Sequence, residues 1–210
     1  MLKELKRDID DNKLSKRVLN SFTENTEQGI DLIAHNLNRA SELVSSFKQV
    51  AVDQVSDKIR KVNMSKYLNE IIHSLHPKLK NTQHSINVDC PDNIEIYCHA
   101  GALAQIFTNL VINSLIHGFK AIDSGIISIQ IKQARDFLHI TYKDNGHGLS
   151  EEQMTHLFDA FYTTNANQGG SGLGTHIVQN LVQDTLNGEI NVTSALEEGL
   201  QYDIKFRSME

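Results

Sequence analysis

The feature that most constrains the fold is a long segment without helix breakers at the start of the chain. Residues 1 to about 60 contain no proline and a single glycine, Gly29. From Ile33 onward, apolar residues recur in steps of four and three, at positions 33, 37, 40, 44, 47 and 51. This spacing is typical of a helix whose a/d seam packs against other helices. We therefore expect one long helix from about Ser15 to Val55, preceded at residues 2–7 by the end of an earlier helix.

A long amphipathic helix cannot bury its apolar stripe alone, because helix stability in proteins comes mainly from packing. The sequence therefore implies a partner helix, supplied by an upstream segment, by a second subunit or by both. We expect residues 1–62 to be part of a helical dimerisation hairpin and residues 63–210 to form a separate domain.

The composition of the chain limits its partners and its setting. A formal net charge of −6 gives no general basic field, so nucleic acid is not an expected partner. Cys90 and Cys98 form no CxxC pattern and no disulfide framework, which favours a reduced, cytoplasmic setting. The sequence shows no signal peptide and no apolar run expected to span a membrane, so no membrane contact is expected from this chain.

After residue 57, segments with helical and strand periodicity follow one another. The pattern predicts a helix that starts at Met64 and is ended by Pro77, and further helices at 101–116, 151–158 and 173–186. It predicts alternating strands at 85–89, 94–98, 126–131, 137–143, 189–194 and 200–206. This order favours an α+β fold, a two-layer sandwich in which helices cover one face of a mixed sheet.

Three polar residues share one face of the helix at 101–116 and its continuation. Asn109, Asn113 and His117 stand at i, i+4 and i+8, away from the apolar stripe. An amide oxygen is a hard, neutral ligand for Mg²⁺, so a row of amides suits a phosphate and metal site. Taken alone, three polar residues indicate a solvated helix face more often than a site.

Two glycine-containing motifs follow. In the first, 144–148, Asp144 comes after a strand, and Gly146 and Gly148 allow the backbone to pass close to a ligand. In the second, 168–175, the glycines precede a helix, whose N-terminal amides can receive phosphate oxygens. Between them lie Phe158 and Phe161, for which we favour packing over contact with a nucleotide.

In this order and spacing, the four motifs resemble the N, G1, F and G2 boxes of the ATP-binding domain of sensor histidine kinases of two-component systems. That domain belongs to a superfamily shared with DNA gyrase, heat-shock chaperone and mismatch-repair ATPases. The resemblance covers roughly residues 64 to 206 and implies that the chain binds ATP with Mg²⁺.

The resemblance also implies roles for individual residues. Asn113 would hold the Mg²⁺ that bridges the triphosphate and would thereby act in catalysis, with Asn109 and His117 near the phosphates. Asp144 would accept a hydrogen bond from the adenine amine, with Gly146 and Gly148 beside the base. The loop over the ATP would be a lid, with its hinge at Thr163 and Thr164 and its phosphate-binding end at Gly170, Ser171, Gly172, Leu173 and Gly174.

The sequence departs from the family pattern at two positions of the N box. Many histidine kinases carry a basic residue where this chain has Ile116, so the resemblance does not extend to the phosphate contact of that residue. The ATPase branches of the superfamily carry a glutamate as general base where this chain has Asn109, and an amide cannot accept that proton. The expected chemistry is therefore phosphoryl transfer to a protein group and not the hydrolysis of an ATP-driven clamp.

The phosphoacceptor that the resemblance implies is a histidine in a His-Glu/Asp-x-x-x-Pro pattern, and none of the ten histidines fits it. His35 lies on the long helix but lacks an acidic neighbour and a proline, so a surface role is favoured. We expect the chain to begin just after the acceptor, to form homodimers through the hairpin, and to serve a response-regulator receiver domain. The alternative is an ATP-binding regulator without kinase activity, or a response-regulator phosphatase.

Overall fold

The computed structural model describes residues 15–56, 58–163 and 172–209. The chain divides into two units, Met1–Ser45 and Ser46–Glu210, each considered by itself. The expected domain boundary between residues 62 and 63 stays a prediction.

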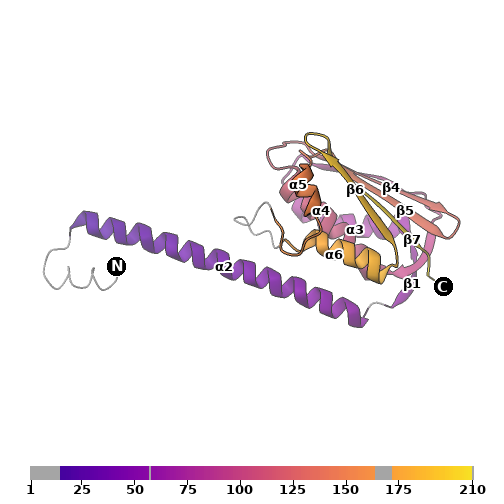
Figure 1. The fold of residues 1–210 in the computed structure, drawn as a ribbon, viewed down its shortest axis with the longest axis horizontal. Coiled ribbons are helices and arrows are strands. Elements are labelled where there is room, and N and C mark those ends of the chain that lie inside the picture. The colour runs from indigo at the N-terminus through magenta and orange to yellow at the C-terminus, as the bar shows by residue number, and fades with distance from the viewer. Residues whose placement is uncertain (1–14, 57, 164–171, 210) are drawn as a thin grey trace. The chain divides into compact units, whose positions relative to one another are not determined.

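The first described element is the helix α2, Lys16–Ser56, of 41 residues (Figure 1). Its bounds agree with the helix expected from about Ser15 to Val55. At its start, Ser15 Oγ accepts a hydrogen bond from the backbone N–H of Val18 at 3.3 Å, which satisfies one of the free amides of the first turn. Large apolar side chains along α2 are 47–65% exposed, at Leu19, Ile30, Leu32, Ile33 and Leu37. The side chains of the seam at 40, 44, 47 and 51, and the expected helix at 2–7, lie outside the described residues.

The centre of the second unit is a five-stranded sheet with the strand order β2-β4-β5-β7-β6. Its strands are β2 (Ser85–Asp89), β4 (Ile126–Ala134), β5 (Phe137–Asp144), β7 (Gly199–Arg207) and β6 (Glu189–Ala195). β2 runs parallel to β4 and the other pairs are antiparallel, so the sheet is mixed. The strands predicted from alternation are therefore confirmed, each within a few residues.

A second, two-stranded sheet pairs β1 (Ile59–Asn63) with β3 (Glu95–His99) in antiparallel register. The pattern analysis missed β1, whose five residues contain only two apolar side chains, and only Val62 of β1 is fully buried. Lys61 and Glu95 form an ion pair across the two strands at 2.7 Å. The strands on either side of residues 90–93 thus belong to different sheets and do not pair with each other.

The helix α3, Met64–Leu79, corrects one expectation: it does not end at Pro77. A proline removes one backbone donor, which is costly in a helix interior but mild in the last turn. The turn closes beyond it, because the N–H of Lys80 donates to the carbonyl of His76 at 2.9 Å. At the other end, Asn63 caps the helix by accepting from the N–H of Lys66.

The remaining helices are short and two of them end in π-helical turns. They are α4 (Ala100–Asn113) with the π turn η1 (Ser114–Gly118), α5 (Glu151–Thr155), and α6 (Gly174–Asn180) with the π turn η3 (Leu181–Thr185). The pattern predicted one continuous helix at 101–116 and another at 173–186, so their extents are right and the π turns were missed. α5 ends three residues before the expected 158.

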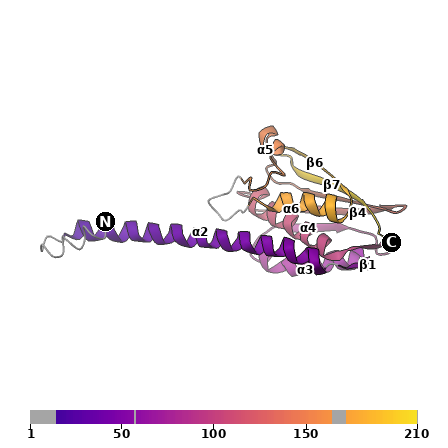
Figure 2. The same ribbon diagram turned by 60° about the horizontal axis from the view of Figure 1, so that its bottom comes forward.

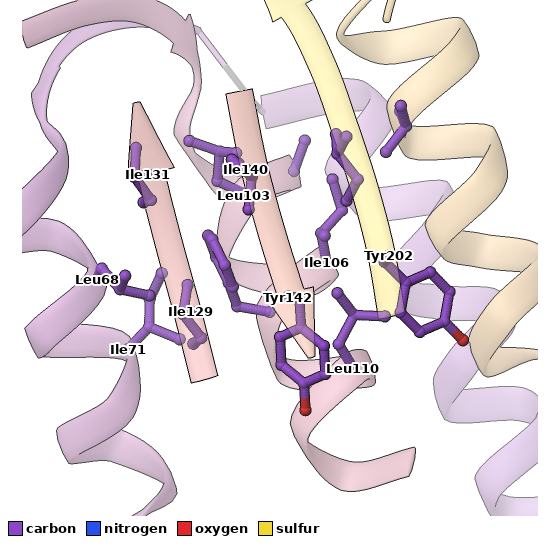
Figure 3. Packing of buried hydrophobic residues seen from close by; sticks show 14 of the residues in the cluster. Leu68, Ile71, Leu103, Ile106, Leu110, Ile129, Ile131, Ile140, Tyr142 and Tyr202 are labelled. Carbon is purple, nitrogen blue, oxygen red and sulfur yellow. The ribbon is translucent and has the colours of Figure 1, made fainter. Parts of the chain in front are cut away.

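The core lies between the five-stranded sheet and the helices α3, α4 and α6, which cover one face of it (Figure 2). Alternate residues of the central strands point into this layer, such as Ile129 and Ile140, and meet Leu103 and Ile106 of α4 (Figure 3). The arrangement confirms the two-layer α+β sandwich. The segment Ala100–Gly118 is long and apolar enough to cross a membrane, but half of it is buried within this core, which accounts for its composition.

Candidate nucleotide-binding site

Three segments that are distant in sequence meet at one end of the sandwich. They are the end of α4 with η1, the end of β5 with the loop after it, and the start of α6. A β-carbon at Gly174 would lie 3.2 Å from Oδ1 of Asn113, and one at Gly118 would lie 3.4 Å from Oδ2 of Asp144. The structure therefore places Asn113 against the start of α6, and Asp144 against the end of η1.

Asp144 is a buried carboxylate with hydrogen-bond donors on both of its oxygens. It is the last residue of β5 and only 2% exposed. Its Oδ2 accepts from Ser114 Oγ at 2.5 Å, and its Oδ1 accepts from the N–H groups of Gly146 at 2.9 Å and Leu200 at 3.3 Å. A carboxylate offers about four acceptor positions, so about one remains on Oδ2. A small donor such as an exocyclic amine could use it.

The glycines after Asp144 are required by close backbone approach. A β-carbon at Gly146 would lie 2.6 Å from the carbonyl oxygen of Gly118. Gly148 has φ of 70°, and a β-carbon there would overlap the carbonyl oxygen of Ala195. At both positions the close neighbours are backbone atoms of the protein itself, so the expected approach of the chain to a base stays a prediction.

His147 belongs to this turn, and His117 lies in η1, whose last residue, Gly118, contacts His147. The backbone N–H of His147 donates to the carbonyl of Gly118 at 3.1 Å, and its Nδ1 lies 2.9 Å from the same oxygen. Because a carbonyl only accepts, Nδ1 of His147 carries the proton. Burial lowers the pKa of His117, and repulsion from His147 and Lys120 lowers it further. His117 therefore presents a neutral imidazole near pH 7.

Two amide side chains on α4 each have one buried atom without a hydrogen-bond partner among the described residues. They are Nδ2 of Asn109 and Oε1 of Gln105. A buried donor without a partner is costly, so a polar ligand at Asn109 would remove that cost. Gln105 was missed by the sequence analysis, although its position one turn before Asn109 extends the polar row at 109, 113 and 117.

The described residues contain no group of three or more His, Cys, Asp or Glu that could hold a metal ion. Mg²⁺ is commonly held by one or two protein ligands together with the phosphates of a nucleotide. The amide oxygen of Asn113, next to the N-terminus of α6, fits that type of site and not an all-protein cage.

The two ends of the expected lid are joined. The N–H of Phe161 donates to the carbonyl of Gly172 at 2.9 Å, and Gly172 has φ of 68° with no room for a β-carbon beside Phe161. Thr163 and Leu173 lie at these ends, whereas Thr164, Gly170 and Ser171 lie outside the described residues.

The two phenylalanines before the lid differ. Phe158 packs against the core, as expected. Phe161 is 63% exposed, so the expectation that it packs is wrong. Its backbone is in the left-handed region, with φ of 69°, where its N–H closes the loop on Gly172 and its ring stays outside the core.

The start of α6 is fastened to the segment before the lid by side chains that sequence reasoning did not single out. Thr175 Oγ1 donates to the carbonyl of Leu157 at 2.6 Å. Nδ1 of His176 donates to the carbonyl of Phe158 at 3.0 Å, and Nε2 of His176 accepts from Asn180 Nδ2 at 3.2 Å. These contacts fix the helix that carries Gly174 against Asn113.

Residues 98–209 match the family described as "Histidine kinase-, DNA gyrase B-, and HSP90-like ATPase", which is more than half of the chain. The chain belongs to this family. It is 27% identical over 184 residues to sporulation kinase A of Bacillus subtilis, covering 87% of this chain and 29% of that protein. It is also 27% identical over 190 residues to the signal transduction histidine-protein kinase ArlS of Staphylococcus aureus, covering 86% of this chain and 40% of that protein. The chain therefore contains a histidine-kinase ATP-binding catalytic domain.

Solved structures support the same fold. The catalytic domain of histidine kinase ThkA has a TM-score of 0.61 at 21% identity, covering 72% of this chain and 96% of that one. Full-length ShkA, solved in complex with AMPPNP, has a TM-score of 0.63 at 19% identity, covering 94% of this chain and 40% of that one. The chain spans 26–40% of the length of the first curated relatives that it matches.

Proposed function

We propose that this chain binds ATP with Mg²⁺ and acts as the catalytic part of a two-component sensor histidine kinase. It would transfer the γ-phosphoryl group to a histidine that this chain does not carry, for relay to an aspartate of a response-regulator receiver domain. The observation that carries the proposal is the buried Asp144, held by three donors and left with one acceptor position.

In this proposal, different residues bind the base, the metal ion and the phosphates. Asp144 accepts from the adenine amine, with Gly146 and Gly148 keeping the chain close to the base. Asn113 gives its amide oxygen to Mg²⁺, which when bound would neutralise charge on the phosphates. Asn109 donates its unpartnered amide hydrogen towards a phosphate, and His117 lies nearby. We propose that Thr163 and Thr164 form the hinge of the lid and that Gly170, Ser171, Gly172, Leu173 and Gly174 form its phosphate-binding end.

Phosphoryl transfer to a protein group fits the site better than hydrolysis. Water activation needs a general base, and Asn109 cannot accept a proton. Positioning and charge stabilisation dominate phosphoryl transfer, and these are what the amides and the start of α6 supply. We propose residues 1–62 as a dimerising hairpin and residues 63–210 as the ATP-binding domain, acting in the cytoplasm whether or not a longer protein is anchored in a membrane.

The test is calorimetric titration of the chain with ADP in Mg²⁺. The wild type should bind, and Asp144→Asn should weaken binding at least about tenfold, because a charge-assisted hydrogen bond is lost and an amide hydrogen can face the adenine amine. The variant keeps the shape of the side chain, so a thermal unfolding curve close to wild type is the control. No binding by the wild type, or equal affinity in the variant, would refute the assignment.

A further inference from the structure

Asp144 receives one of its hydrogen bonds through a chain of hydroxyl groups. Ser114 Oγ donates to Oδ2 of Asp144 at 2.5 Å, and it also lies 2.8 Å from the hydroxyl of Tyr142. A hydroxyl has a single hydrogen, and a carboxylate only accepts. With the hydrogen of Ser114 given to Asp144, the bond to Tyr142 must run the other way. The chain is therefore directed, from Tyr142 to Ser114 to Asp144.

Burial keeps this direction fixed. Tyr142 is fully buried and Ser114 is 3% exposed, so water does not compete for either hydroxyl. Burial raises the pKa of Tyr142 well above its ordinary value, with Asp144 adding to the effect and the bond to Ser114 opposing it. The phenol therefore stays protonated and remains a donor throughout the physiological pH range.

The fold explains why these three residues meet. Tyr142 and Asp144 are two apart on β5, so both side chains point to the helix-covered face. Ser114 is the first residue of η1, directly after Asn113. The other carboxylate oxygen, Oδ1, is held by the backbone N–H groups of Gly146 and Leu200. Both oxygens are thus oriented, and the remaining acceptor position on Oδ2 has a fixed direction.

We propose that Ser114 and Tyr142 are positioning residues that determine the specificity of the site for adenine over a 6-oxo purine. The inference rests on the proposed function, since it takes Asp144 as the group that meets the base. Adenine has an amine at C6 that a fixed carboxylate oxygen accepts, whereas hypoxanthine has a carbonyl there that the same oxygen repels. A carboxylate free to turn would lose part of its hydrogen bond to adenine, whereas it makes no hydrogen bond to the carbonyl of hypoxanthine that could be lost.

The chain provides a matched control in Tyr202. Tyr202 is the cross-strand partner of Tyr142 on β7, with ring centroids 6.2 Å apart, and it is equally buried. Figure 3 shows the two rings side by side with their hydroxyls pointing in different directions. The hydroxyl of Tyr202 has no partner among the described residues. Removing it therefore perturbs the same core without touching the chain of hydroxyls.

The experiment compares binding of ADP and inosine diphosphate by the full chain in Mg²⁺, with the weaker ligand measured by competition. The variants are Tyr142→Phe, Ser114→Ala, the double variant and Tyr202→Phe, each checked by thermal unfolding without nucleotide. Tyr142→Phe and Ser114→Ala should each weaken ADP binding about threefold to tenfold, the range expected for one buried hydrogen bond, and leave inosine diphosphate unchanged. The double variant should bind ADP no more weakly than Ser114→Ala, because the hydroxyls act in series.

Each other outcome decides against the inference. If Tyr142→Phe keeps full ADP affinity, or weakens both nucleotides equally, the hydroxyls do not set base specificity. If Tyr202→Phe loses as much as Tyr142→Phe, the effect belongs to the core and not to the chain of hydroxyls. If Ser114→Ala fails to fold, the ADP affinities of Tyr142→Phe and Tyr202→Phe still test the inference. If the wild type binds no ADP, the proposed function itself is refuted. If Asp144→Asn loses ADP binding but Tyr142→Phe and Ser114→Ala keep it, this inference alone is refuted.

Discussion

A few polar side-chain atoms determine what the candidate site can bind, because the residues around them are mostly apolar or contribute only backbone atoms. Asp144 has donors on both oxygens, whereas the buried Nδ2 of Asn109 has no partner in the described part of the chain. A polar group with hydrogen-bond partners holds its orientation, whereas a buried polar group without a partner favours a ligand that can bond to it. The end of the site at Asp144 is therefore preorganised, and the end at Asn109 gains its hydrogen bonds when a polar ligand arrives.

His117 gives a prediction about pH at this scale. Its pKa is lowered, chiefly by burial, so the free protein holds it neutral near pH 7. A bound polyphosphate would favour the imidazolium and raise this pKa, so binding takes up a proton and tightens as the pH falls. ADP titrations between about pH 8 and about pH 6 should show affinity rising towards acid.

The matched variants make this pH dependence specific. His117→Asn should abolish most of it, because the titrating group is gone. His139→Asn, on β5 at the end away from Asp144, should keep it. A pH dependence that survives in His117→Asn would assign the proton uptake to another group.

At the residue scale, the sequence predicted the polar positions but not their connections. Asn109, Asn113, His117 and Asp144 were recognisable from spacing and from the motifs. The hydroxyl chain was not, because Ser114 lies 28 residues from Tyr142 and 30 from Asp144, and only the packing of η1 on β5 brings them together. The sequence places Gln105 one turn before Asn109, but only the packing of α4 shows that its Oε1 is buried with no partner in the described segments.

Among the elements, α6 is a short helix that is held in position by side-chain hydrogen bonds at its N-terminus. It has only seven residues before η3, and Thr175 and His176 donate to the carbonyls of Leu157 and Phe158. Short helices are marginal alone and depend on such tertiary contacts. The position of Gly174 beside Asn113 follows from them.

This attachment can be tested by stability. Thr175→Val removes the hydroxyl with little change in shape and leaves the carbonyl of Leu157 unpaired, which should lower the free energy of unfolding by about 1–2 kcal/mol. Thr175→Ser keeps the donor and should retain most of the stability. Urea unfolding of the two variants measures the difference, and equal midpoints would show that the hydrogen bond to Leu157 contributes nothing.

The order and type of the elements followed from periodicity, and the errors have local causes. Pro77 lies in the last turn of α3, where a proline is tolerated, so it did not end the helix. The π turns at Ser114–Gly118 and Leu181–Thr185 keep helical periodicity in sequence, so the pattern could not separate them from α-helix. The strand β1 is too short and polar to be recognised before its pairing with β3 is known.

For the whole chain, the expected activity is ATP binding without autophosphorylation. A kinase needs a bound nucleotide and a nucleophilic histidine that an adjacent group orients. His35 lies on α2 without an acidic neighbour in sequence, and no histidine of the chain has the His-Glu/Asp-x-x-x-Pro pattern. Incubation with γ-labelled ATP and Mg²⁺ should leave the protein unlabelled, and label should appear on an added hairpin that carries the acceptor. Acid-labile label on this chain that is lost in His35→Gln would contradict the expectation.

The parallel pairing of β2 with β4 has a consequence for folding kinetics. The other four strands of the sheet pair in antiparallel fashion, whereas β2 can pair only after the crossover that contains β3, α4 and η1 has closed. Closing such a long loop costs conformational entropy before any contact between β2 and β4 forms. We therefore expect β2 to pair with β4 late in folding. Because α4 and η1 carry Asn113 and Ser114, the proposed nucleotide site becomes complete only at that late step. Nucleotide should therefore slow the opening of this edge in hydrogen exchange, and protect β2 and α4 more than the β6–β7 hairpin.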